Sequence, residues 1–97
     1  MAETSLSSSL TATGATGGVM MRNGIVRVSG TFVATLQVEV DALGNGVYAP
    51  ALDGAGLAIN ISTPGVMKIE NGVGCFVRVN CTAYTSGTVA VALRGGN

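Results

Sequence analysis

The sequence predicts an all-β fold: a small antiparallel β-sandwich, or a jelly-roll-like barrel, of seven or eight short strands. The segment 31–40 is the strongest observation, because apolar and polar side chains alternate there with a period of two over ten residues. Turn signals recur every 6–12 residues, and most of the 15 glycines fall at these turns. No stretch shows the 3.6-residue period of an amphipathic helix.

Turn residues divide the first part of the expected domain into three strands. A short apolar segment at 19–22 is followed by Asn-Gly at 23–24, a pair typical of hairpin turns. The next strand, 25–28, is followed by Ser-Gly at 29–30 and then by the long strand at 31–40. The inward face of this long strand is expected to consist of Phe32, Ala34, Leu36, Val38 and Val40.

The middle of the chain is expected to hold two strands separated by glycine-rich loops. Residues 41–46 form a loop suited to positive φ angles, and a strand at 47–52 follows it. Pro50 has no amide hydrogen, so this strand is expected at a sheet edge or at a bulge. After a turn at 53–56, apolar residues alternate with smaller ones over 57–62, which predicts the next strand.

Three further strands are expected in the last third. A strand at 66–70 is followed by a second Asn-Gly pair at 71–72. The segment 75–83 alternates clearly, and Ser-Gly at 86–87 turns the chain into a last strand at 88–94. The inward residues of these last two strands are expected to be Val77, Val79, Cys81, Ala83, Val89, Val91 and Leu93.

Residues 1–18 are expected to form a flexible arm in front of a single β-sandwich domain at 19–97. The arm contains almost only Ser, Thr, Ala and Gly, with Leu6 and Leu10 as isolated apolar anchors. Two interpretations are open. The arm is either a tail without a role or a segment that orders against a neighbouring subunit through its two leucines.

The composition indicates a surface that is partly covered by partner subunits. The chain is 47% hydrophobic and only 10% charged, whereas ordinary soluble proteins contain about 25% charged residues. Five basic and five acidic residues give a net charge of zero, which disfavours direct nucleic-acid binding. No apolar run approaches the roughly 20 residues of a membrane helix, and no secretory signal is recognisable, so we expect synthesis in a cytoplasm.

No catalytic, cofactor or metal site is expected. The chain has no histidine, which removes Ser-His-Asp and Cys-His catalysis and the commonest zinc sites. Cys75 and Cys81 on one strand would lie roughly 20 Å apart, too far for a disulfide, and are expected to be small buried hydrophobic residues. Asp41 and Asp53 are expected to cap turns rather than to bind calcium.

The carboxylates on the predicted strands are the remaining candidates for catalysis. Glu39 and Glu70 are the strand carboxylates, but a glycosidase pair would need them roughly 5–10 Å apart in a cleft, usually with aromatic rings, and the chain has no tryptophan.

Ala90 and Ala92 face away from the core and predict a flat surface that another backbone approaches. Phe76, also on the outer face, predicts a second packed layer, either another subunit or the other sheet.

The motifs of the chain resemble those of small virion proteins of tailed bacteriophages. Gly-Thr-Phe at 30–32 followed by Thr-Leu-Gln at 35–37 is similar to a strand of those proteins, and Gly-Val-Tyr at 46–48 is similar to the strand that comes next. Phe-Val-Arg-Val at 76–79 and the segment 82–89 fit the same pattern. Arg78 matches the usual arginine of its strand, and Tyr48 stands where tryptophan is common.

The resemblance implies a non-enzymatic virion structural protein. Within that group, the implied function is that of a capsid decoration (cement) protein, which self-associates, commonly as a trimer, and binds the major capsid protein to stabilise the shell. Its location would be the virion, after synthesis in the cytoplasm of a bacterial host. The interface residues expected for this function are Leu6, Leu10, Phe76, Ala90 and Ala92. The alternative is a tail or head-fibre component that binds a carbohydrate or receptor.

Overall fold

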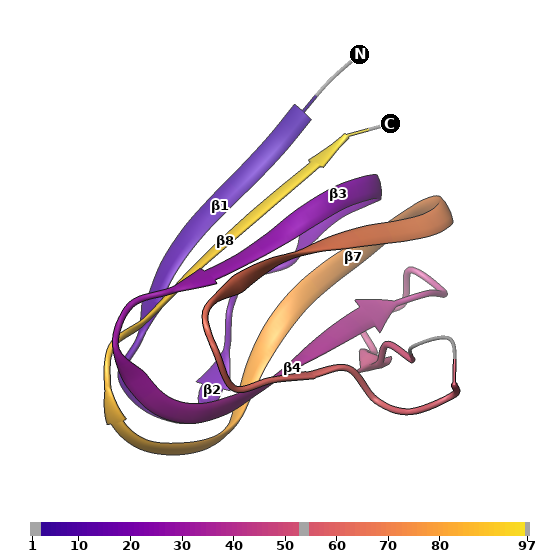
Figure 1. Ribbon diagram of the computed structural model, residues 1–97. Helices are drawn as coiled ribbons and strands as arrows, with labels where there is room; N and C mark the ends of the chain where they lie inside the picture. The colour runs from indigo at the N-terminus through magenta and orange to yellow at the C-terminus, as the bar shows by residue number, and fades with distance from the viewer. Residues whose placement is uncertain (1–2, 53–54, 97) are drawn as a thin grey trace.

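A computed structural model, which describes residues 3–52 and 55–96, shows one curled antiparallel sheet in the form of a half-barrel (Figure 1). The described residues form strands, turns and loops and no helix, which confirms the all-β prediction. The sheet is continuous from one side of the molecule to the other, so the more specific prediction of a sandwich is not confirmed.

Eight strands make up the sheet. They are β1 (Glu3–Leu10), β2 (Gly14–Ala15), β3 (Val19–Ser29), β4 (Phe32–Asp41), β5 (Ala49–Pro50), β6 (Asn60–Ile61), β7 (Gly65–Gly87) and β8 (Val89–Gly96). Their order is β1-β8-β3-β7-β4-β5, with β2 paired to β7 and β6 paired to β4. β8 therefore lies between β1 and β3, although it follows β7 in the sequence.

The curl comes from two long strands that continue through positions where turns are predicted. β7 pairs with β3 through its first half and with β4 through its second half, so it joins the two sides of the half-barrel. The predictions of turns at 23–24 and 71–72 are wrong, because both pairs lie inside strands. Instead, the register of β3 with β7 shifts between Met21 and Asn23, where β7 has three more residues than β3. Gly24 is needed there because β8 approaches closely: a Cβ would collide with the carbonyl oxygen of Arg94.

The core lies on the inner face of the curled sheet and confirms most of the predicted alternation. Leu36, Val38, Val77, Val79, Val89 and Leu93 are all completely buried. Ala83 is an exception, because it is exposed. The pairing of β4 with β7 passes from Thr35–Ala83 to Leu36–Cys81, which leaves Thr82 as an extra residue. This bulge turns Ala83 outward and brings Tyr84 against the core.

The N-terminal segment differs from the predicted flexible arm. The strand β1 pairs with β8 over eight consecutive residues, and Figure 1 shows the two strands side by side. Leu6 and Leu10 lie on the inner face, where they are partly buried against the core of their own chain. The period of two in the Leu-Ser-Ser-Ser-Leu sequence at 6–10 permits this, and β8 supplies the apolar partners.

Two short strands and the loops around them lie along the open edge of β4. β5 pairs only with β4, so the predicted edge position of Pro50 is confirmed. The predicted strands at 47–52 and 57–62 are shorter in the structure, with an isolated bridge between Leu52 and Ala58. Ala51, Ile59 and Ile61 nevertheless pack against the core, so this segment covers part of the inner face.

Candidate functional site

The loop after β4 is held by one buried carboxylate. Asp41 is 4% exposed, and its Oδ1 accepts hydrogen bonds from the backbone amides of Gly44 (2.9 Å) and Asn45 (3.2 Å). Its Oδ2 accepts a third from the amide of Gly46 at 2.9 Å. These bonds fix the loop in one conformation and confirm the predicted turn-capping role of Asp41. Asp53, the other predicted cap, lies outside the described residues.

A second polar cluster joins the same loop to the outer face of the sheet. Arg78 Nε donates to Glu39 Oε1 at 2.7 Å, and Asn80 Nδ2 donates to Glu39 Oε2 at 3.3 Å. The guanidinium of Arg78 also stacks on the ring of Tyr48, 4.0 Å from its centroid. The side chain of Glu39 is only 10% exposed, and both of its oxygens are occupied. Its arrangement is that of a structural ion pair rather than of one half of a glycosidase pair.

Phe76 lies on the outer face beside this cluster. It is 39% exposed, and the ring of Tyr48 and the backbone at Gly18 lie close to it. A Cβ at Gly18 would collide with the hydroxyl of Tyr48 and come within 3.5 Å of the Cβ of Phe76. The layer expected over Phe76 is therefore supplied in part by the loops of its own chain, and the rest of its ring stays exposed.

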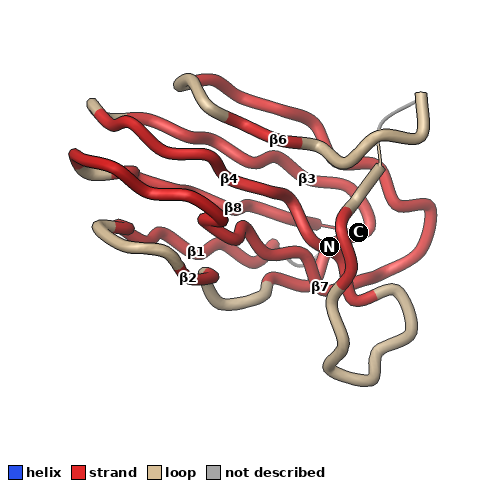
Figure 2. The backbone as a smooth tube through the Cα atoms, turned by 90° about the horizontal axis from the view of Figure 1, so that it is seen from below, coloured by secondary structure: helices blue, strands red, loops and turns tan. Residues whose placement is uncertain are grey.

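Four large apolar side chains are exposed in the two loops at one end of the half-barrel. We call them the loop-end patch: Leu43 (84% exposed), Val47 (68%), Leu52 (61%) and Leu57 (65%). Figure 2 shows the loop after β4 and the loop between β5 and β6 on the same side of the molecule, where they extend in different directions. Sequence reasoning missed the patch, because it assigned three of these residues to strands with buried faces.

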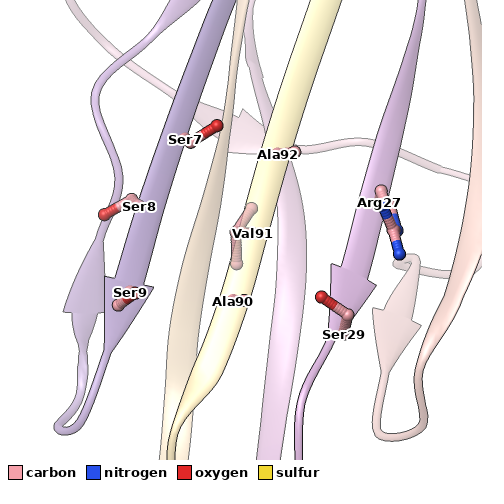
Figure 3. A pocket seen from close by; sticks show the side chains of 8 residues that line it. All are labelled: Ser7, Ser8, Ser9, Arg27, Ser29, Ala90, Val91 and Ala92. Atoms are coloured by element: carbon pink, nitrogen blue, oxygen red, sulfur yellow. The ribbon is translucent and has the colours of Figure 1, made fainter.

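The outer side of β8 forms a shallow groove with its neighbours. Figure 3 shows its lining, which comes from three adjacent strands: Ser7, Ser8, Ser9, Arg27, Ser29, Ala90, Val91 and Ala92. Ala90 and Ala92 are half-buried there, with β1 and β3 paired on either side of β8, and the approach of another backbone over this face stays a prediction. The groove has a volume of about 250 Å³, below the roughly 300–1,000 Å³ of small-molecule sites.

The described residues hold no group of side chains suited to binding a metal ion. Within 3–52 and 55–96, no three His, Cys, Asp or Glu side chains are grouped as metal ligands would be. Cys75 and Cys81 are free thiols, 5% and 1% exposed, which confirms the prediction of small buried residues. None of the described segments is a helix long and apolar enough to span a membrane.

Comparisons with protein-family models, with curated proteins and with solved structures found no match to this chain.

Proposed function

We propose that the chain is a non-enzymatic virion structural protein: a capsid decoration protein that self-associates and binds the major capsid protein to stabilise the shell. The observation that carries the proposal is the loop-end patch. Large apolar side chains exposed on two loops that are joined through β5 favour a surface for binding another protein. Burying them against a partner contributes about 25 cal/mol per Å² of apolar surface.

The loop that carries half of this patch is ordered before any partner binds. Asp41 holds the backbone of residues 44–46 through three hydrogen bonds, and Leu43 and Val47 flank that segment. A loop with a fixed conformation loses little conformational entropy on association, which favours tight binding by a small surface. Many copies bound to one repetitive shell would add avidity to each contact.

The motifs that resemble phage virion proteins also come together in the fold. Tyr48 belongs to one of these motifs and Arg78 to another, and their side chains stack at 4.0 Å. The stacking supports the proposed class, because it gives both residues a shared structural role. It also weakens the alternative of a carbohydrate-binding module, since Tyr48, the aromatic residue nearest the loops, is engaged by Arg78.

The proposal predicts that polar substitutions in the patch weaken shell binding. Leu43→Ser combined with Val47→Ser should lower the affinity for purified capsids at least about tenfold, because two exposed apolar side chains are lost from the contact. The measurement is co-sedimentation of the chain with capsids over a range of concentrations.

Val33→Ser is the matched control for this experiment. Val33 is 59% exposed but lies near the start of β4, far from the loop that follows this strand. Its replacement should leave capsid binding unchanged. Equal binding by the Leu43→Ser/Val47→Ser variant and the unsubstituted chain would remove the patch from the interface.

A further inference from the structure

The outermost strand of the sheet, β1, has an edge without the features that usually prevent edge-to-edge pairing. It pairs with β8 on one side, and no described residue pairs with its other side. Proteins normally protect such an edge with charged residues, proline or bulges. Between Thr4 and Leu10, β1 contains no charged residue, proline or glycine. Its register with β8 runs without a shift over all eight residues.

Three other edges of the sheet carry such features. β5 contains Pro50, and the first half of β7, which pairs with β3 alone, carries Lys68 and Glu70. The open start of β4 is twisted by two register shifts, one after Val33 and one after Thr35. The contrast singles out β1 as the edge that is suited to pairing.

We propose that β1 pairs in antiparallel fashion with β1 of a second copy of this chain, around a two-fold axis at Ser8. A self-complementary contact of this kind places Leu6 opposite Leu10 of the partner, twice, and Ser7 opposite Ser9 of the partner, twice. Both leucines are only partly buried within one chain. Pairing extends the inner apolar face across the axis and covers the rest of their side chains.

The charges of the strand permit this contact. The 18 residues between Glu3 and Arg22 contain no charged residue, so no like charges oppose each other near the axis. Ser5, Ser7 and Ser9, on the outer face, are small and exposed and place no bulk between the two copies. The two half-barrels then share one continuous sheet.

This inference deepens the self-association in the proposed function, but it does not depend on a capsid partner. A two-fold contact makes a dimer, in place of the trimer that the resemblance implies. One strand pair buries less than the roughly 1,200–2,000 Å² of a stable complex, so the dimer should be weak and dependent on concentration.

Light scattering and sedimentation velocity on the full chain, up to roughly 1 mM, test the contact. The mass should rise toward twice 9.6 kDa. Ser7→Glu with Ser9→Glu places like charges in both opposed pairs and should weaken the dimer at least about tenfold. Ser7→Lys with Ser9→Glu places opposite charges in the same pairs and should preserve it.

Both variants change exposed side chains, and circular dichroism with thermal melting verifies that each is folded. A trimer or a monomer throughout the concentration range would overturn the inference. If the variant with Ser7→Glu and Ser9→Glu dimerised as strongly as the unsubstituted chain, the edge of β1 would be excluded as the contact. Loss of the dimer in the variant with Ser7→Lys and Ser9→Glu would exclude the proposed register. If the variant with Ser7→Glu and Ser9→Glu were monomeric and still bound capsids, the proposed function would stay intact. Failure of the β1 contact is therefore distinguishable from failure of the proposed function.

Discussion

Replacing Leu36 by alanine should lower the free energy of unfolding by about 2–5 kcal/mol. Leu36 is completely buried at the centre of β4, opposite Cys81 on β7 and Ile61 on β6. Its loss leaves a cavity in the core on the inner face of the curled sheet. Small domains are stable by only about 5–15 kcal/mol, so this change is a large fraction of the total. Urea denaturation monitored by circular dichroism measures it.

Val33→Ala is the control on the same strand. Val33 is 59% exposed, and its truncation should change the free energy of unfolding by less than about 1 kcal/mol. A similar decrease in the free energy of unfolding for Leu36→Ala and Val33→Ala would mean that the inner face of the curled sheet is not the core of the protein.

Replacing Arg78 by methionine should lower the free energy of unfolding by about 1–3 kcal/mol. Methionine keeps much of the length of the side chain but leaves the carboxylate of Glu39, 10% exposed, with the amide of Asn80 as its remaining donor. Arg78 itself is 31% exposed, so solvent screens the pair and the loss stays below that of a fully buried ion pair.

A double-mutant cycle with Glu39→Gln isolates the ion pair. In the Glu39→Gln background, Arg78→Met should lower the free energy of unfolding by about 1 kcal/mol less than it does in the unsubstituted chain. The double variant is then more stable than the sum of the two single changes predicts. Arg27→Met, at an exposed position, should change stability by less than about 0.5 kcal/mol. Strict additivity would show that Arg78 and Glu39 are not coupled.

The fold class follows from local patterns, whereas the shape of the sheet depends on contacts distant in sequence. Alternation at 31–40 and 75–81 predicts the buried faces of β4 and β7 correctly. The bulge that turns Ala83 outward depends on how β7 pairs with β4. The Asn-Gly pair at 23–24 stays extended because β8, about 70 positions later, pairs alongside it. Propensity alone favours a turn there.

The candidate site is less accessible to sequence reasoning than the core. The capping role of Asp41 is predictable, because an aspartate before a glycine-rich segment favours backbone hydrogen bonds. The exposure of Leu52 and Leu57 is not, because apolar residues near alternating segments predict buried strand faces. Likewise, Leu6 and Leu10 are expected to contact a neighbour, and only the pairing of β1 with β8 shows them against their own core.

The most direct test of the proposed function is quantitative mass spectrometry of virions purified from the bacteriophage source that the proposal implies. A decoration protein should be present in a copy number comparable to that of the major capsid protein, and it should remain on heads from which the tails have been removed. Absence from the virion, or a few copies that leave with the tails, would contradict the account.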